Sequence, residues 1–178
     1  SPYYLSKNIK NKKKVRREIK WLKNIVENIR CKKFIYLSSS SVYINKHPIG
    51  EIKLKCENIL KSKNNFTTQI WRPFNIIGKP NKNLSDHFHN LLLKKMLINK
   101  KKTIYFNGHQ DDERGYSSAK KLVDNIIFKS KRDQNFILNY GNKNTIKVKE
   151  ILKIFFEIFK IKSKDFKIKF KGVNKNKN

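Results

Sequence analysis

The sequence predicts an α/β protein with parallel strands. Segments whose apolar residues recur with the period of a helix alternate along the chain with short β-prone segments. Such alternation is typical of a parallel sheet covered by helices. Four serines at 38–41 directly follow one β-prone segment, and the segment Arg-Pro-Phe-Asn at 72–75 follows another. The carboxyl ends of strands are where open α/β sheets bind ligands.

The expected helices are segments in which apolar residues recur every three or four positions. In chain order they span 15–29, 50–60, 84–96, 122–127 and 148–159. The expected strands are rich in β-branched and aromatic residues. They span 33–37, 67–71, 103–106, 136–139 and 166–170. Pro73 lacks the backbone N–H that a central strand uses, so we expect the second strand to stop before Arg72-Pro73. Asn107-Gly108 predicts a turn.

The chain is strongly basic, with a formal net charge of +30 from 43 basic and 13 acidic residues. Such a charge favours nucleic acid or an anionic membrane as partner. Only six of the basic residues are arginines, the side chain that suits bidentate phosphate and base recognition. Lysines are spread along the chain together with Asn and Ile, and all three have A/T-rich codons. Compositional bias is therefore the preferred explanation, and nucleic acid is not expected as a partner.

The apolar residues, cysteines and histidines of the sequence bear on three further questions: membrane insertion, disulfide bonding and metal binding. No apolar run approaches the roughly 18 residues of a membrane helix, so no membrane is expected. Cys31 and Cys56 give no disulfide framework or metal spacing, which favours a reducing, cytoplasmic setting. His87 and His89 lie near Asp86 and suggest a metal, but further ligands are not evident, and a surface helix is the preferred interpretation.

Two segments that follow predicted strands are candidates for chemistry. Residues 38–41 are four consecutive serines, whose hydroxyls could bind a substrate at a strand end. The alternative is a loop that caps a helix, and spacing alone favours capping. The segment WRPFNIIG at 71–78 is either the wall of a ligand crevice or an ordinary strand exit.

These segments, in their order, resemble the NAD-dependent epimerase/dehydratase family of extended short-chain dehydrogenases. The similar stretches are FIYLSSSSVY, PIGEIKLKCENIL, IWRPFNIIGKP, the region from Gly108 to Tyr116, and FILNYGNKNTIKVKEIL. They match the family's serine-rich strand end, its PYG-x-SK-x-x-x-E helix, its R-P/Y-F-N-x-x-G strand end and two later segments. No single motif is strong, but the ordered set covers about four-fifths of the chain.

The resemblance implies roles for the matched positions. Ser39 matches the catalytic Ser/Thr that holds the substrate hydroxyl or carbonyl. Lys53 matches the lysine that binds the nicotinamide ribose and lowers the pKa of the catalytic tyrosine, and Glu57 matches an acidic residue of the same helix. The implied cofactor-binding residues are Ser38, Lys53, Pro73 and Phe74. The implied substrate-binding residues are Ser39, Asn75 and Arg114, and the guanidinium of Arg114 suits a diphosphate.

The sequence departs from the family pattern in ways that affect activity. Ile49 stands at the position of the tyrosine that acts as general acid/base, and isoleucine has no proton to transfer. The stretch between Tyr43 and Pro48 is shorter than usual. The Gly-rich turn that cradles the cofactor pyrophosphate is absent. Further along, Gly115 and Lys121 stand where aspartates are usual.

A second Tyr-x-x-x-Lys, from Tyr116 to Lys120, has the spacing that places two side chains on one helical face. It follows the RPFN strand, whereas the family's pair precedes it, so we interpret it as the start of a helix rather than as a catalytic pair.

The resemblance implies a partial Rossmann-like parallel sheet, the C-terminal half, with a small α/β substrate-binding subdomain. Residues 1–80 are expected to form the half-domain for NAD (or NADP), and 81–178 most of the subdomain, with segments that return to the main sheet. The expected protein is an N-terminally truncated or catalytically impaired nucleotide-sugar epimerase/dehydratase, with a nucleotide-diphosphate sugar as ligand. A homodimer is left open.

Two alternatives to this function remain. The first is a non-catalytic remnant that binds a sugar nucleotide. The second is a basic nucleic-acid-binding protein. Aromatic side chains along an Arg-rich face would support the second, and the sequence shows no such stripe.

Overall fold

The computed structural model of the chain describes residues 12–44, 47–78, 92–98, 102–106 and 108–171. The chain divides into two compact units. Residues 117–141 belong to the first unit although they follow much of the second in sequence. Within the described residues, no helix is both long and apolar enough to span a bilayer.

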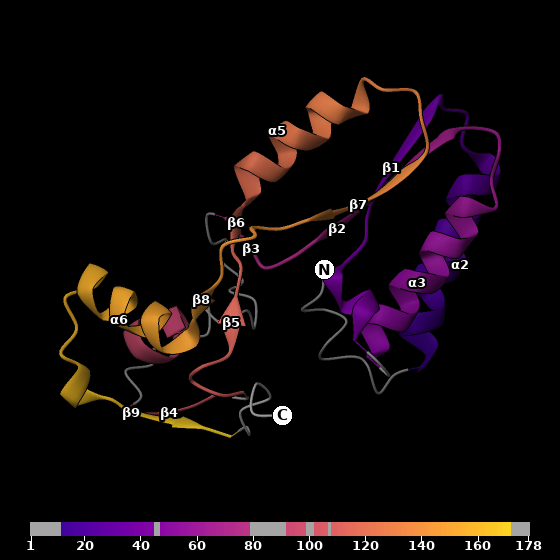
Figure 1. Cartoon of the computed structure of the whole chain (residues 1–178). Helices are drawn as coiled ribbons and strands as arrows, with labels where there is room; N and C mark the ends of the chain where they lie inside the picture. Colours follow the sequence, from indigo (N-terminus) through magenta and orange to yellow (C-terminus); the bar gives the residue numbers. More distant parts are fainter. Residues whose placement is uncertain (1–11, 45–46, 79–91, 99–101, 107, 172–178) are drawn as a thin grey trace. The chain divides into compact units, whose positions relative to one another are not determined.

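The first unit is built on a three-stranded parallel sheet of order β1-β2-β7, which confirms the predicted fold class (Figure 1). Its strands are β1 (Lys33–Leu37), β2 (Thr67–Pro73) and β7 (Phe136–Tyr140), and its helices are α2 (Lys12–Asn28), α3 (Pro48–Lys61) and α5 (Ala119–Ser130). A short 3-10 helix, η1 (Ser40–Tyr43), links β1 to α3, and β3 (Ile76–Ile77) pairs with β6 (Ser117–Ser118).

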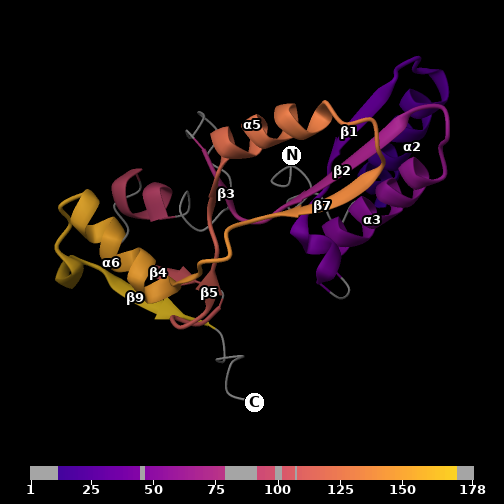
Figure 2. The ribbon, with the colours of Figure 1, turned by 45° about the horizontal axis from the view of Figure 1, so that its top comes forward.

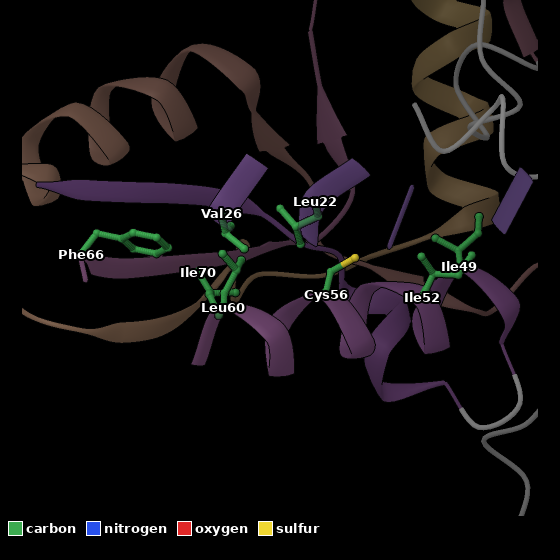
Figure 3. Close-up of a cluster of buried hydrophobic side chains, with 8 residues drawn as sticks. All are labelled: Leu22, Val26, Ile49, Ile52, Cys56, Leu60, Phe66 and Ile70. Atoms are coloured by element: carbon green, nitrogen blue, oxygen red, sulfur yellow. The ribbon is translucent and has the colours of Figure 1, made fainter. Parts of the chain in front are cut away.

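One face of this sheet packs against α2 and α3 through an apolar core. Alternate residues of β1, Phe34 and Tyr36, point to this core because side chains alternate along a strand. The buried members of the core are Leu22, Val26, Ile49, Ile52, Cys56, Leu60, Phe66 and Ile70 (Figure 3). The core fixes α3, and with it the side chains that α3 carries to the end of the sheet.

The opposite face of the sheet lies toward α5 (Figures 1 and 2). Trp71 and Gln69 of β2 are fully buried on this face. The Gln69 side-chain amide donates to the carbonyl oxygen of Arg132, just past α5, at 2.8 Å, and the Trp71 ring meets Phe136 edge-on. The sheet is therefore covered on both faces at its central strand, as parallel sheets require.

Most predicted elements are confirmed, with shifted ends. Helix α3 starts two residues before the predicted 50 because Pro48 occupies its first turn and His47 Nδ1 accepts the Gly50 N–H. The prediction that β2 stops before Arg72 was wrong. The strand continues to Pro73, which pairs with Tyr140, and the Phe74 N–H completes the ladder by donating to the Tyr140 carbonyl at 2.8 Å.

The second unit contains a parallel pair of strands, β4 (Thr103–Phe106) and β9 (Lys167–Phe170), and an antiparallel pair, β5 (Glu113–Arg114) and β8 (Ile146–Lys147). Helix α6 (Val148–Ile158) covers one face of the β4–β9 pair. Of the helix predicted over 84–96, only the end lies within the described residues, where residues 93–98 form a π-helix, η2 (Leu93–Ile98). Of the predicted turn at Asn107-Gly108, Asn107 lies outside them, and Gly108 has a positive φ of 121°.

Gly50 allows the close contact between α3 and η1. A Cβ atom at this position would lie 2.1 Å from the Ser41 carbonyl oxygen, which is backbone and cannot rotate away. We expect Gly50→Ala to lower the free energy of unfolding by about 1–3 kcal/mol through overpacking, as measured by urea denaturation. The exposed Lys55→Ala in the same helix is the control and should change little. If the two variants had equal free energies of unfolding, Gly50 would not lie in close contact with the Ser41 carbonyl.

Candidate functional site

The serine-rich segment starts at the carboxyl end of β1, beside the end of β2. Leu37 pairs with Trp71, and the Ser38 N–H extends the ladder by donating to the Trp71 carbonyl oxygen at 2.7 Å. On the other side of β2, Arg72 pairs with Asn139 of β7. Side chains from three strand ends therefore meet at one edge of the sheet, which is the position of ligand sites in open α/β sheets.

Ser39 caps the 3-10 helix η1. Its backbone is extended, and its Oγ accepts hydrogen bonds from the Ser41 N–H at 3.1 Å and the Ser41 hydroxyl at 2.9 Å. This is the capping arrangement that the spacing favoured. Both bonds use the Ser39 oxygen as acceptor, and neither uses its hydroxyl proton. The proposed substrate role of Ser39 stays a prediction.

A buried ion pair connects α3 to the end of β2. Glu57 is 0% exposed, and its carboxylate accepts two bonds from one guanidinium, Arg72 Nε at 2.9 Å and Nη2 at 2.5 Å. The Ser38 hydroxyl donates to the same carboxylate at 2.5 Å. The bidentate geometry and the third donor satisfy a charge that would be costly to bury alone. Ser38, predicted to bind cofactor, is thus engaged within the protein.

The pKa values of this pair shift in the directions that favour its charged form. Burial raises the pKa of Glu57, but the hydrogen bonds from Arg72 and Ser38 outweigh burial, and the net pKa lies below the ordinary carboxyl value. The hydrogen bonds to Glu57 raise the pKa of Arg72. The pair is therefore ionised at neutral pH.

The same guanidinium holds Tyr43 at the surface. Arg72 Nη1 donates to the Tyr43 oxygen at 2.6 Å, and the Tyr43 hydroxyl donates to Asn139 Oδ1 at 2.8 Å. The Tyr43 ring stacks on Phe74, with ring centroids 6.1 Å apart. Tyr43 is nevertheless 55% exposed. A polar network thus runs from the buried carboxylate to an exposed phenol and aromatic pair.

Lys53, expected to bind the nicotinamide ribose, has its ammonium group engaged inside the first unit. Its Nζ lies 3.1 Å from Glu18 Oε1, 3.2 Å from the Tyr36 hydroxyl and 3.4 Å from the Leu37 carbonyl oxygen. An ammonium has three N–H donors, so these three acceptors can use all of them. The ammonium group of Lys53 therefore lies at the end of β1, where the serine-rich segment begins.

Ile49, which the sequence resemblance matches to the family's tyrosine, is part of the core. Ile49 is 8% exposed and belongs to the cluster beneath the sheet, beside Ile52 (Figure 3). Tyr36 brings a different phenol to Lys53, but burial raises the pKa of Tyr36 above its ordinary value. A phenol with a raised pKa is not primed to transfer a proton near neutral pH.

The residues after β2 remain near this edge in the first unit. Phe74 lies against Gly141, where a Cβ atom would approach the Phe74 Cβ to 3.1 Å. Asn75 is exposed and has a positive φ of 39°, which asparagine tolerates, and its carbonyl accepts the Ser117 N–H at 3.2 Å. No hydrogen bond within the described residues joins the Asn75 side chain to Ser39 or Lys53, and the expected substrate-binding role of Asn75 stays a prediction.

Arg114 and Tyr116 belong to the second unit. Arg114 lies in β5 opposite Ile146, and its guanidinium lies near Tyr116, whose pKa burial raises and Arg114 partly lowers. Helix α5 begins at Ala119, so Tyr116 precedes it and the i,i+4 spacing to Lys120 does not apply. This confirms the interpretation of that segment as a helix start.

Metal chemistry finds no support in the part of the chain that the structure describes. It contains no group of three or more His, Cys, Asp or Glu side chains that could hold an ion. His87 and His89 lie outside the described residues. His47, at the start of α3, accepts a backbone hydrogen bond as a helix cap.

Sequence reasoning missed Arg72, Tyr43 and Asn139 as members of the network. Arg72 was interpreted only as part of a strand stop, and the other two received no role. Strand register is the signal that could have found two of them, because adjacent parallel strands bring Arg72 opposite Asn139. Tyr43 lies in η1, and register says nothing of it.

Removing Arg72 from the ion pair should reverse the way in which the free energy of unfolding depends on pH. In the native chain, the stability contributed by Glu57 is present above the ordinary carboxyl pKa and is lost as the pH falls through the lowered folded pKa. Arg72→Leu leaves the buried carboxylate without its counter-charge, so the pKa of Glu57 should rise and stability should fall as the pH increases. We expect a loss of about 3–5 kcal/mol at neutral pH, measured by urea denaturation across the acid to neutral range.

The control for this experiment is the double variant Glu57→Gln, Arg72→Leu. It removes both charges and should recover part of the stability with a weaker pH dependence. If Arg72→Leu kept the pH profile of the native chain, the ion pair would not be the source of this stability.

Comparison with known proteins identifies the fold through structure rather than sequence. No family model and no curated protein matches the chain. Solved structures do match. The UDP-N-acetylglucosamine 4-epimerase from Methanobrevibacter ruminantium M1, in complex with UDP-N-acetylmuramic acid, is 22% identical over 96% of this chain and 59% of its own, with a TM-score of 0.68.

Two further solved structures extend this likeness. The UDP-glucuronic acid 4-epimerase from Bacillus cereus, in complex with UDP-glucuronic acid and NAD, is 22% identical over 85% of this chain and 53% of its own, with a TM-score of 0.71. An NAD-dependent NDP-hexosamine 5,6-dehydratase involved in tunicamycin biosynthesis is 16% identical over 89% of this chain and 57% of its own, with a TM-score of 0.70. The chain thus spans between 53% and 59% of these three proteins, and it has the fold of the C-terminal part of NAD-dependent nucleotide-sugar epimerases and dehydratases.

Proposed function

We propose that the chain is the nucleotide-sugar-binding part of an epimerase/dehydratase-type protein and that it does not catalyse hydride transfer as it stands. The observation that carries this proposal is the polar network at the carboxyl ends of three parallel strands, where open α/β sheets bind ligands. The network ends in the exposed ring of Tyr43, which stacks on the half-buried ring of Phe74. The shared fold with nucleotide-sugar enzymes supports the choice of ligand class.

The residues of this chain alone do not fit NAD. The six glycines of the sequence include no Gly-rich turn to cradle a pyrophosphate. The ammonium of Lys53, which the family would use for the nicotinamide ribose, already faces three protein acceptors. Binding of NAD at this site would therefore need groups that the residues of this chain do not supply.

A non-catalytic sugar-nucleotide-binding module is the second candidate, and the burial of Ile49 favours it. The side chain at the tyrosine position packs into the core, so the chain has adapted this position to packing rather than to proton transfer. Both candidates bind a nucleotide sugar. They differ in whether the chain would convert that sugar once a Gly-rich half-domain for NAD is supplied.

Binding is tested with UDP-glucuronic acid, the ligand of one structural neighbour. We expect calorimetric titration to detect binding, and Phe74→Ala to weaken it because the stacked pair loses one ring. The matched control is Phe128→Ala, which removes a ring that is 64% exposed on α5 and should leave affinity unchanged. Inorganic pyrophosphate tests for attraction by charge alone. Equal binding of pyrophosphate, or equal effects of the two substitutions, would contradict the proposal.

Catalysis is tested by comparing the native chain with two variants. We expect no NAD-dependent turnover by the native chain, and none by Ile49→Tyr alone, because the new phenol starts from a core position and a misplacement of about 1 Å can cost on the order of a hundredfold in rate. The second variant carries Ile49→Tyr behind a grafted Gly-rich half-domain. The readout is the epimerised or dehydrated UDP-sugar, separated by chromatography, because the cycle returns its hydride to the sugar and leaves no net NADH.

The three outcomes of the catalytic test have different meanings. Turnover by the ungrafted chain would contradict the proposal. Turnover only after grafting would place the main defect in cofactor binding. No turnover by either variant, with both folded, would favour the non-catalytic module. It would also indicate that the short segment between Tyr43 and Pro48 prevents catalysis.

A further inference from the structure

The β4–β9 pair of the second unit has one apolar and one basic face. Ile104 and Phe106 of β4, with Ile168 and Phe170 of β9, point to the core beneath α6. The alternate residues point to solvent because side chains alternate along a strand. Figure 1 shows α6 on one side of this pair. The outer face carries no helix among the described elements of this unit.

Three lysines and one tyrosine occupy this outer face. Lys167 and Lys169 alternate with the apolar residues of β9, and the Lys171 N–H continues the ladder by donating to the Phe106 carbonyl oxygen at 2.8 Å. Tyr105, opposite Lys169 in β4, is 46% exposed. The ammonium groups of Lys169 and Lys171 lie 5.7 Å and 4.9 Å from its ring centroid.

The charges of these lysines are not neutralised within the described part of the chain. Lys33, Lys53, Lys120 and Lys149 each form an ion pair with a carboxylate. None of the lysines on the β9 face does so among the described residues. Alternate positions on one strand lie about 6.6 Å apart, so the face presents a regular row of cations beside an aromatic ring.

We propose that this lysine–tyrosine face, formed by Tyr105, Lys167, Lys169 and Lys171, binds single-stranded nucleic acid without sequence preference. Proteins of this kind combine a row of cations along the backbone with aromatic rings on which bases stack. Lysine is a point charge that suits phosphates, and the two ammonium groups over Tyr105 would move to phosphates and uncover the ring. This proposal is independent of nucleotide-sugar binding at the other unit.

Single-stranded nucleic acid fits this face better than an anionic membrane does. Proteins that lie on membranes insert several apolar side chains into the lipid. Here the apolar side chains of both strands point to the core, and Tyr105 is the sole aromatic among the four residues of the face. The four residues of the face include no arginine, the side chain that suits base recognition, which agrees with binding that has no sequence preference.

The test measures binding of a fluorescent oligothymidylate of about 12 nucleotides by anisotropy, between about 50 and 200 mM salt. The logarithm of the affinity should fall linearly with the logarithm of the salt concentration. Each phosphate contact on a single strand contributes about 0.7 to the slope. The triple variant Lys167→Gln, Lys169→Gln, Lys171→Gln should therefore reduce the slope by about 2.

Two further variants distinguish binding at this face from binding through the net charge of the chain. The control triple Lys20→Gln, Lys23→Gln, Lys55→Gln removes the same charge from exposed positions of α2 and α3, and should retain most of the slope. Tyr105→Leu should weaken binding by about five- to a hundredfold, the loss of one stacked base, and leave the slope unchanged. Thermal unfolding confirms that each variant is folded.

Three results would overturn the proposal. The first is an equal loss of slope in the two triple variants, since net charge would then explain binding. The second is unchanged affinity of Tyr105→Leu. The third is binding to phosphatidylserine vesicles without binding to the oligonucleotide, which would identify a membrane surface instead.

Discussion

The bidentate pair between Glu57 and Arg72 is the interaction on which the rest of the strand-end site depends. A fully buried carboxylate is stable only while its charge is matched and its oxygens accept hydrogen bonds. One guanidinium satisfies both requirements and keeps a third nitrogen for Tyr43. The pair therefore links a helix, a strand end and a surface phenol, and the Ser38 hydroxyl ties the preceding strand to the same carboxylate.

Helix α3 packs into the core with one face and carries charged side chains to the strand ends on another. Ile49, Ile52 and Cys56 bury one face in the core, whereas Lys53 and Glu57 carry charge toward the ends of the strands. The core contacts set the position of the helix, and that position decides which polar groups can meet. Because Ile49 belongs to the packing face, placing a phenol at this position would disturb the same contacts that hold Glu57 in place.

The sequence predicted the element order and the parallel sheet well, because period and β propensity are local signals. The strand at 33–37 matched β1 at both ends. The end of β2 was missed because Pro73 is tolerated where the Phe74 N–H completes the ladder with Tyr140. The contacts of Arg72 with Tyr43, and of Tyr43 with Asn139, join residues 29 and 96 positions apart. Such contacts depend on the register of β2 and β7 and on where η1 lies beside them, which composition and spacing do not contain. Glu57 was found through family resemblance, but its partner was not.

We infer that the ion pair of Glu57 and Arg72 organises the carboxyl ends of the sheet. An NMR titration of the Glu57 side-chain carboxyl carbon in the native chain tests it most directly. We expect a pKa below the ordinary value for a glutamate, because the hydrogen bonds and charge of Arg72 and the hydrogen bond from the Ser38 hydroxyl outweigh burial. A pKa at or above the ordinary value would mean that burial dominates, and it would contradict an intact ion pair at this site.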